Sequence, residues 1–328
     1  MAYQVQMNTA REAQKAAEVT RRLPYSDSSF ERVTHALGTL YLNNELDVEQ
    51  KLIEAYQVPA EVTGVSVSLD RVSVPMEEPD PQDQGAIIRV YRMAWSGTVT
   101  LHDREGQAVD TIRYGRMPQG DAMGLMEAMV SDVDVMRKQR PELLVSSIAD
   151  GAADVWELLD SYINKDELKT EVTRLIDLWH NIEKLGKAAR VLYGEQRSDS
   201  VVARWKMLLL NDSEAASQIL EELVASGHRE SRVGDTRPVH EAITYLENHR
   251  EQMDYATARK QGRPVGSGPV EANCKSLFEV RMKRPGARWK QSTGDDIVRL
   301  RALALSDRWD EAMHLVLAPV RTAVRRVA

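Results

Sequence analysis

The sequence predicts an α/β fold in which a mixed sheet is interrupted by a long helical segment. Three observations lead to this prediction. Between residues 62 and 117 apolar and polar residues alternate with the period of β-strands. An apolar run at 141–152, typical of a buried strand, comes directly after a segment with helical periodicity at 120–140. From about 153 to 255 nearly every segment has helical periodicity. A chain of 328 residues is long enough for two domains, or for one large domain with an insertion.

The individual elements follow in chain order. Residues 1–57 are predicted to be helical, with helices at 28–41 and 47–56. After a change of texture at Val58, the strands are expected at 62–76, 87–103, 107–117 and 141–152, with an acidic, Pro-rich loop at 76–86 and a helix at 120–140.

Three strands, a helix and a fourth strand form the opening of a ribonuclease H-like fold, although many α/β domains share this order. We therefore expect a ribonuclease H-like mixed sheet core with a large all-helical insertion and a short helical N-terminal region. The expected divisions are the N-terminal region at 1–57, the first part of the core at 58–152, the insertion at 153–260, and the C-terminal part of the core at 261–328.

Composition excludes several classes of protein. The hydrophobic content of 42% and charged content of 28% are ordinary for a globular domain, and the net charge of −7 argues against a uniformly basic DNA-coating protein. A single cysteine, Cys274, excludes an internal disulfide and a multi-cysteine zinc site. No run of 18 apolar residues and no signal peptide is recognisable, so we expect no membrane association and a cytoplasmic location.

The most informative segment is Gly266–Trp289, in which one carboxylate precedes a dense set of cations. Gly268 and Pro269 suit the start of a helix, which places Glu271 in its first turn. Between Lys275 and Lys290 six cations face one anion, a local charge of +5. Cations of this density favour contacts with a phosphate backbone. The predicted nucleic-acid-binding residues are Lys275, Arg281, Lys283, Arg284, Arg288, Trp289 and Lys290.

Two further carboxylates lie where an α/β sheet collects its functional groups. Asp70 lies in the first predicted strand and Asp150 at the carboxyl end of the fourth. With Glu271 they form an Asp/Asp/Glu triad of catalytic metal ligands for Mg²⁺, or for Mn²⁺ in its place, in two-metal phosphoryl transfer. Among 50 acidic residues some such triple arises by chance, and it is the strand, strand-end and helix-start positions that favour this one.

Three motifs resemble those of the DDE transposases of bacterial insertion sequences, specifically the ISKra type. The resemblance extends over about residues 60–315. It is carried by Gly266, Gly268, Glu271, Cys274, Lys275, Arg281, Lys283, Gly286, Arg288 and Trp289; by Asp150, Gly151, Ala152 and Trp156; and by Asp177, His180 and Leu185. It implies a ribonuclease H-like core with a helical insertion, metals held by Asp70, Asp150 and Glu271, and cleavage and strand transfer of double-stranded DNA by a homo-oligomer.

Two departures from the family pattern keep other functions open. The family usually has Asp-Gly at the first acid, where this chain has Asp70-Arg71, and it usually has a longer DNA-binding N-terminal region. The chain is thus also consistent with a truncated or repurposed transposase-derived DNA-binding protein without catalysis, with one product of a split reading frame, or with a ribonuclease H-like nuclease that performs no strand transfer.

The remaining aromatic and titratable residues are interpreted as structural, with one exception. We expect His180 to be buried or hydrogen-bonded, with a supporting role near the metals as the alternative, and Cys274 to pack in the core. Trp156, Trp179, Trp205 and Trp309 are expected in the core, whereas Trp289 lies within the basic run, where it would contact DNA by stacking or by strand separation.

Overall fold

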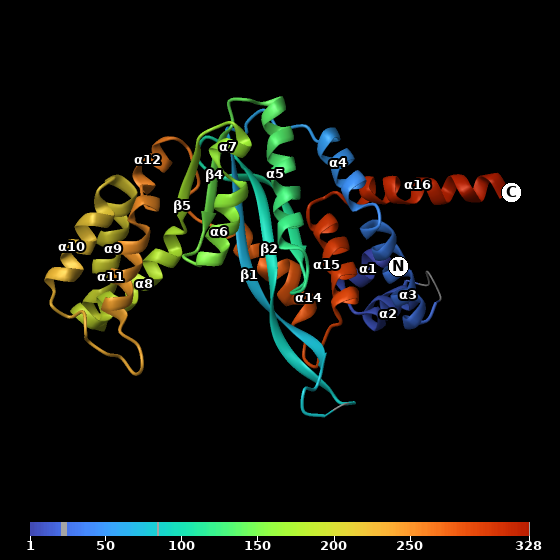
Figure 1. Cartoon of the computed structure of the whole chain (residues 1–328), viewed down its shortest axis with the longest axis horizontal. Helices are drawn as coiled ribbons and strands as arrows, with labels where there is room; N and C mark the ends of the chain where they lie inside the picture. The colour runs from blue at the N-terminus through green and yellow to red at the C-terminus, as the bar shows by residue number, and fades with distance from the viewer. Residues whose placement is uncertain (21–24, 84, 328) are drawn as a thin grey trace.

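The structure, a computed structural model, describes residues 1–20, 25–83 and 85–327. Residues 21–24 of the predicted N-terminal helical region and residue 84 of the predicted acidic loop lie outside this description. A five-stranded sheet forms the centre, in the order β3-β2-β1-β4-β5 (Figure 1). Its strands are β1 (Gly64–Pro79), β2 (Ile87–His102), β3 (Ala108–Arg116), β4 (Leu144–Ala149) and β5 (Val172–Ile176).

The first three strands form an antiparallel meander whose first two strands extend beyond the rest of the sheet. β1 and β2 pair over their full lengths, from Gly64 opposite His102 to Pro79 opposite Ile87. β3 pairs only with the second half of β2, starting with Trp95 opposite Arg116. Residues 71–79 and 87–94 therefore extend beyond the end of β3 as a two-stranded ribbon, which runs toward the bottom of Figure 1. The buried side chains of this ribbon pack against η2 (Cys274–Glu279) and α14 (Val280–Met282).

The parallel part of the sheet sets the positions of the two predicted acids. β1 pairs with β4 from Gly64 opposite Leu144 to Val67 opposite Ser147, a constant offset of 80 residues. Continued three residues along both strands, the same offset brings Asp70 opposite Asp150. Asp150 is the residue after the end of β4, so its position opposite Asp70 continues the register beyond the last paired residues, Val67 and Ser147. The two carboxylates are near enough for the charge of Asp150 to act on Asp70.

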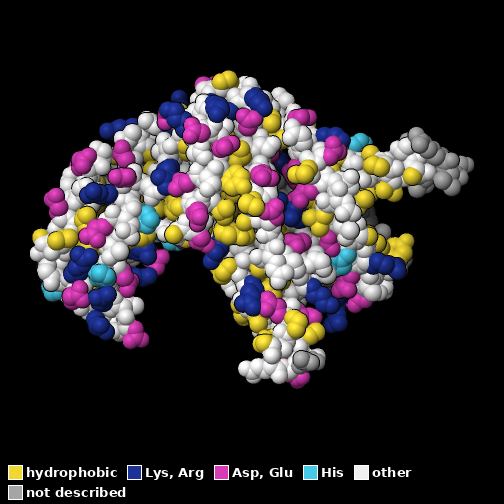
Figure 2. All heavy atoms as spheres, in the orientation of Figure 1, with side chains coloured by type: hydrophobic (Ala, Val, Ile, Leu, Met, Phe, Trp, Pro, Cys, Tyr) yellow, Lys and Arg dark blue, Asp and Glu magenta, His cyan; other side chains and the backbone are white. Residues whose placement is uncertain are grey.

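Helices cover the sheet and extend it at both ends. α5 (Ala122–Gln139) and α6 (Ala153–Tyr162) pack against the sheet, as do α13 (Gly268–Asn273), the π-helical η2 (Cys274–Glu279), α14 (Val280–Met282) and α15 (Gln291–Leu305). A helical lobe is made by α8 (Leu178–Tyr193), α9 (Glu195–Asn211), α10 (Ala215–Ala225), α11 (Pro238–His249), η1 (Arg250–Gln252) and α12 (Tyr255–Lys260), with the short α7 (Lys165–Leu168) before it. Figure 2 shows the surface deeply hollowed between this lobe and the β1–β2 ribbon.

The predicted α/β architecture with a mixed sheet is confirmed, and so are the four strands expected in the first half of the chain. One prediction is wrong: the segment from 153 to 255 is not wholly helical, because Val172–Ile176 forms β5 at the edge of the sheet. The sequence Val-Thr-Arg-Leu-Ile is short, and its apolar residues fit a helix as well as a strand. The segment forms a strand because it pairs in parallel with β4.

The N-terminal helices are packed against the C-terminal ones. They are α1 (Ala2–Met7), α2 (Ala10–Val19), α3 (Asp27–Leu42) and α4 (Glu45–Ala55). Tyr41, Val48 and Leu52 share an apolar cluster with α15 and with α16 (Trp309–Val327). Burial of such side chains contributes roughly 1.5–3 kcal/mol each, so these helices belong to the folded body.

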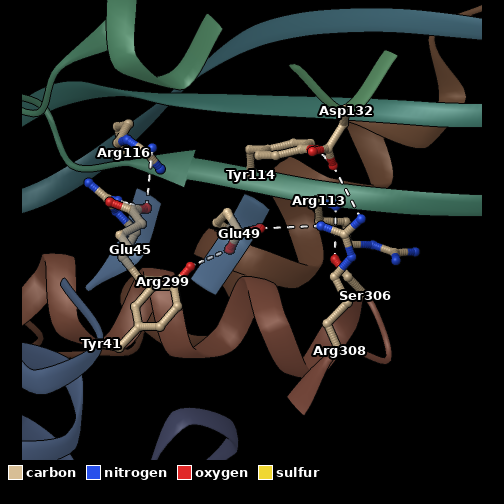
Figure 3. Close-up of polar contacts among 10 residues, drawn as sticks. All are labelled: Tyr41, Glu45, Glu49, Arg113, Tyr114, Arg116, Asp132, Arg299, Ser306 and Arg308. Carbon is tan, nitrogen blue, oxygen red and sulfur yellow. Dashed lines mark hydrogen bonds and ion pairs between the residues drawn. The ribbon is translucent and has the colours of Figure 1, made fainter. Parts of the chain in front are cut away.

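A buried ionic network joins the same helices to the sheet (Figure 3). Nη1 of Arg308 lies 3.2 Å from a carboxylate oxygen of Glu49 on α4, and its Nη2 lies 3.2 Å from Asp132 on α5. Tyr41 donates a hydrogen bond to Glu49, and Tyr114 on β3 donates one to Asp132. Burial raises the pKa of both carboxyl groups, and the charge of Arg308 opposes that rise.

We predict that Arg308→Met destabilises the protein by about 3–5 kcal/mol, because it leaves two buried carboxylates without a cation. Urea unfolding measures the effect, and Arg104→Met, which removes an exposed pair with Glu105, serves as the control and should leave the stability nearly unchanged. A loss for Arg308→Met no larger than that of the control contradicts the role assigned to this network.

A second prediction concerns acid. His102, the last residue of β2, is buried with its Nε2 hydrogen-bonded to Oγ of Ser66 at 2.7 Å, and burial lowers the pKa of its imidazole from 6.5 to about 4. Between these two pH values the unfolded chain takes up a proton that the folded chain does not, so stability falls as the pH falls, by up to roughly 3 kcal/mol.

Urea unfolding at pH 7 and pH 4.5 tests this: His102→Gln should lose less stability on acidification than the natural chain by about 2–3 kcal/mol. His314→Gln, which changes an exposed histidine on α16, should keep the natural acid sensitivity. Equal acid sensitivity of His102→Gln and the natural chain would falsify the assignment.

Candidate metal centre

Asp70 lies in the middle of β1, opposite Ser96 of β2, and is partly buried. Its Oδ1 accepts a hydrogen bond from the backbone N–H of Arg71 at 2.6 Å, and its Oδ2 accepts one from the thiol of Cys274 at 3.3 Å. Burial raises the pKa of Asp70, the two hydrogen bonds oppose the rise, and the negative charge of Asp150 adds to it. A carboxylate that is desolvated beside a second one is poised to accept a cation.

Asp150 follows β4 directly and shapes the turn into α6. Its Oδ1 accepts from the N–H of Ala152 at 3.0 Å, and its carbonyl accepts from Nε1 of Trp156 at 2.6 Å. The next residue must be small, because a Cβ on Gly151 would lie 2.5 Å from the ring of Tyr245 on α11. The Asp-Gly pair thus lets the helical lobe approach the carboxyl end of β4.

Glu271 enters from a third element, in the first turn of α13. Its side chain is 48% exposed, and its Oε1 lies 3.7 Å from Nδ1 of His180. Burial raises its pKa, as do the negative charges of Asp177 and Asp70, whereas His180 lowers it. Immediately after α13 the helix widens into the π-helical η2. Such widened turns occur frequently at functional sites.

Asp177 and His180 form a second layer at the start of α8. Asp177 is fully buried: its Oδ1 accepts from the N–H of His180 at 2.8 Å, and its Oδ2 accepts from both the N–H and the hydroxyl of Ser267, the latter at 2.8 Å. Although burial alone would raise it, these contacts lower the pKa of Asp177 to about 2. Contact with Asp177 raises the pKa of His180 to about 9, and the charges of Asp150 and Glu271 act in the same direction.

Asp70, His180 and Glu271 face a common pocket of about 540 Å³, whereas Asp150 and Asp177 are not among the residues that line it. Asp70, His180, Glu271, Cys274 and Lys275 line it, together with Arg71, Val72, Ser73, Trp179, Glu183, Glu279 and Lys283. The lining comes from the base of the ribbon, the first turns of α8 and the helix that follows Pro269, and the first two of these lie on either side of the hollow in Figure 2. Asp150 acts on Asp70 and on His180 through its charge.

Two sets of side chains are candidates to hold a metal. Ligand atoms of Asp177, His180 and Glu271 lie within 4.8 Å of one another. Asp177 is fully buried and its two oxygens accept three hydrogen bonds, through which it orients His180 and the loop at Ser267. The carboxylates of Asp70, Asp150 and Glu271 come from three separate elements and are the hard oxygen ligands that Mg²⁺ and Mn²⁺ prefer, so their chemistry fits such an ion. Among the described residues, however, it is Asp177, His180 and Glu271 whose ligand atoms lie within 4.8 Å of one another, and the oxygens of Asp70, Asp150 and Glu271 are not gathered that closely.

The predicted nucleic-acid-binding cations have different surroundings. Lys275 and Lys290 are exposed, and Lys275 lines the pocket. Lys283 pairs with Glu279 at 2.8 Å and Arg288 lies 3.7 Å from Glu77.

The other three residues of the predicted nucleic-acid-binding set, Arg281, Arg284 and Trp289, make contacts with other parts of the chain. Arg281 is buried, donates to the carbonyl of Val5 at 3.2 Å, and lies over the ring of Trp289. Arg284 pairs with Glu12 at 2.5 Å. Trp289 donates to the carbonyl of Met282 at 3.1 Å and bridges to β1 beside Met76. In this structure these three side chains attach the N-terminal helices and the ribbon to the rest of the chain.

Three residues at the candidate site, Asp177, Trp179 and Cys274, have surroundings that differ from those expected from the sequence. The helical periodicity expected from 153 to 255 hides the start of a helix at Asp177, which caps α8 and is of a residue type preferred at N-caps. Trp179 was expected in the core, but it is 53% exposed and lines the pocket. Cys274 was expected in the core and is only partly buried, with its thiol on Asp70.

Comparisons with known proteins add little to this geometry. No family model and no curated protein matches the chain. Among solved structures it is similar to the Drosophila P element transposase strand transfer complex, with 12% identity and a TM-score of 0.31 over 95% of this chain and 79% of that chain. So distant a likeness carries no argument about function, which rests on the residues described above. No helix in the described ranges has the length and apolar character needed to cross a bilayer.

The metal assignment predicts a specific pattern of thermal stability. Mn²⁺ at about 100 times its dissociation constant should stabilise the natural chain by about 2.7 kcal/mol and raise its Tm, and Asp70→Asn or Glu271→Gln should remove most of this rise. Without metal, Asp70→Asn should be at least as stable as the natural chain, because burial and the charge of Asp150 disfavour the ionised Asp70.

Differential scanning fluorimetry with and without Mn²⁺ measures both effects. Glu183→Gln is the control, since Glu183 lines the same pocket but pairs with Lys187 at 2.8 Å. An undiminished Mn²⁺ response in Asp70→Asn would show that the ion binds elsewhere.

Proposed function

We propose that the chain is a metal-dependent DNA transposase with Asp70, Asp150 and Glu271 as its metal ligands. The observation that supports this most strongly is the pocket that Asp70 on β1 and Glu271 on α13 both line. The parallel pairing of β1 with β4, which ends at Val67 and Ser147, would bring Asp150 level with Asp70 if its offset continued one residue past the end of β4. Carboxylates from two adjacent strands and one helix supply oxygen ligands from three directions, which suits divalent ions acting on a phosphodiester.

The fold in this proposal is ribonuclease H-like. An antiparallel meander of three strands followed by two parallel strands, in the order β3-β2-β1-β4-β5, supports it. So does the position of the helical lobe, which enters the chain between the second and third acids. The resemblance of the Gly266–Trp289 segment to the ISKra-type transposases points to the same family.

The chemistry is two in-line displacements at phosphorus. In the first, a water oxygen bonds to the phosphorus of a phosphodiester, the bond to the 3′-oxygen breaks, and a free 3′-hydroxyl and a 5′-phosphate result. In the second, that 3′-hydroxyl bonds to a target phosphorus and releases the target's own 3′-oxygen. Bound Mg²⁺ or Mn²⁺ would stabilise the charge on the attacking and leaving oxygens.

In this proposal the side chains of the protein hold the metal ions, orient one another and neutralise the charge of the phosphate. Asp70, Asp150 and Glu271 provide the ligand oxygens, while Asp177 holds His180 beside Glu271. Lys275, exposed on the same helical run as Glu271, is placed to neutralise a phosphate. Preorganised charges of this kind, more than acid–base groups, supply the catalysis in phosphoryl transfer.

Arg71 occupies the position at which the family usually has glycine. Its guanidinium forms its ion pair with Asp154 on α6 and not with Asp70, and it lies over the ring of Trp95 at 5.2 Å. The departure at this position therefore leaves the carboxylate of Asp70 without an ion pair to the Arg71 guanidinium, which supports the catalytic proposal over a repurposed, non-catalytic DNA-binding protein.

The partner in this proposal is double-stranded DNA, both the ends of an insertion sequence and the target, and the protein acts on it as a homo-oligomer. The hollow between the helical lobe and the β1–β2 ribbon borders the pocket and offers a path for the duplex (Figure 2).

We predict that the natural chain nicks a labelled duplex in Mg²⁺ or Mn²⁺, and that Asp150→Asn or Glu271→Gln lowers the rate at least 1,000-fold, an expectation drawn from the loss of a transition-state contact of about 4 kcal/mol. Binding of the duplex in EDTA should change less than about threefold in either variant, because the ligands are not phosphate contacts.

Denaturing gels and fluorescence anisotropy provide the two readouts, with Glu183→Gln as the matched control from the same pocket. Duplex binding without nicking by the natural chain would instead favour the non-catalytic DNA-binding protein. Nicking without joining of the 3′-end to a target duplex would favour a ribonuclease H-like nuclease.

A further inference from the structure

Trp179 is an exposed aromatic side chain inside a charged pocket, which is an unusual position for the largest apolar residue. It lies in the first turn of α8 and is 53% exposed, whereas Trp205 on the neighbouring helix is 0% exposed. Leaving an indole in water forgoes the free energy of its burial, roughly 2–3 kcal/mol for a large apolar side chain. An exposed aromatic ring at a functional site commonly contacts a ligand.

The surroundings hold the indole in place. Nζ of Lys206 on α9 lies 4.0 Å from the ring centroid, a cation–π contact. Gly266 lies against another part of the ring, because a Cβ at this position would be 3.1 Å from Cδ1 of Trp179. The first turn that carries Trp179 is itself capped by the buried Asp177. A ring fixed by its neighbours loses little conformational entropy when a ligand stacks on it.

Trp179 also adjoins the groups that would handle the scissile phosphate. It precedes His180 in the chain and lines the same pocket as Asp70 and Glu271. Lys275 and Lys283 line that pocket as well, so phosphate-neutralising charge and an aromatic surface lie within one cavity of about 540 Å³. A charged groove that carries aromatic platforms is how proteins bind unpaired strands, since every base offers a flat π-face.

We propose that Trp179 is the stacking platform for an unpaired nucleobase of the DNA strand next to the scissile phosphate. This inference rests on the proposed function and adds a substrate feature to it: the DNA is bound with one or more bases out of the duplex. Stacking on Trp179 offsets part of the free energy of unpairing, which is a few kcal/mol per base. Lys206 fixes the ring and adds positive charge along the path of the strand.

The test compares two duplex oligonucleotides of the same sequence length, one fully paired and one with a two-nucleotide mismatch bubble that contains 2-aminopurine. Anisotropy in EDTA measures their affinity for the full chain, so the readout is independent of cleavage. Trp179→Ala should weaken binding of the bubble duplex about 5- to 100-fold and of the paired duplex less than about twofold. Trp179→Phe should recover much of the loss.

Tyr91→Ala is the matched control. Tyr91 is 56% exposed and carries Arg89 at 5.1 Å from its ring, but it lies on the ribbon and not in the pocket. It should leave both affinities unchanged. Quenching of the 2-aminopurine fluorescence on binding should be lost in Trp179→Ala and kept in Tyr91→Ala.

The outcomes separate this inference from the proposed function. Tight binding of the bubble duplex by Trp179→Ala, or an equal loss for both duplexes, overturns the stacking role while the metal-dependent nicking of the natural chain stands on its own. Failure of the natural chain to bind either duplex overturns the proposed function and the stacking role together.

Discussion

The parallel pairing of β1 with β4 is the constraint on which the rest of the site depends. Its offset of 80 residues aligns the middle of a long strand with the end of a short one. Asp70 could not occupy this position in a strand that stopped with its partner, so the length of β1 matters as much as its pairing. A shift of one residue in this register would turn one of the two acids to the opposite face. The apolar residues of β1 that alternate into the core prevent such a shift, among them Val65, Val67 and Leu69.

Around Asp70 and Asp150 lie ionisable groups whose desolvation, taken group by group, lowers the stability of the fold. Asp70 and Glu271 both have raised pKa values, and the buried Asp177 would be costly without the three hydrogen bonds that it accepts. The stability that tolerates them comes from elsewhere in the molecule. The apolar core under α5 and α6, the packing of α3 and α4 on α15, and the network around Arg308 all lie outside the pocket. Proteins commonly combine a site whose groups reduce stability with a well-packed remainder that supplies it.

Much of this arrangement can be predicted from the sequence, for identifiable reasons. The strands around Asp70 and Asp150 are recognisable because their alternation and their flanking turns are local signals. Glu271 is recognisable because Gly268 and Pro269 mark a helix start. β5 was missed because five residues of mixed character carry no period of their own, and only pairing with β4 makes them a strand. Because β5 is not recognisable from the sequence, neither is the position of Asp177 directly after a strand and at the N-cap of α8.

The basic segment shows a different limit of sequence reasoning. A charge count cannot distinguish a guanidinium that faces DNA from one that closes a contact within the chain, and Arg281 and Arg284 are of the second kind in this structure. Their partners, Val5 and Glu12, lie more than 250 residues away in the sequence, at 276 and 272 positions, so no local pattern announces them. Trp179 is the converse case, since its helical spacing suggested burial and the structure exposes it.

The central claim is that Asp70, Asp150 and Glu271 together hold the catalytic metal. Anomalous diffraction from crystals of the full chain soaked in Mn²⁺ tests it most directly. The account predicts Mn²⁺ density within about 2.3 Å of carboxylate oxygens of Asp70 and Asp150, with Glu271 as a further ligand. Mn²⁺ bound instead by Asp177, His180 and Glu271, with Asp70 and Asp150 uninvolved, would contradict it.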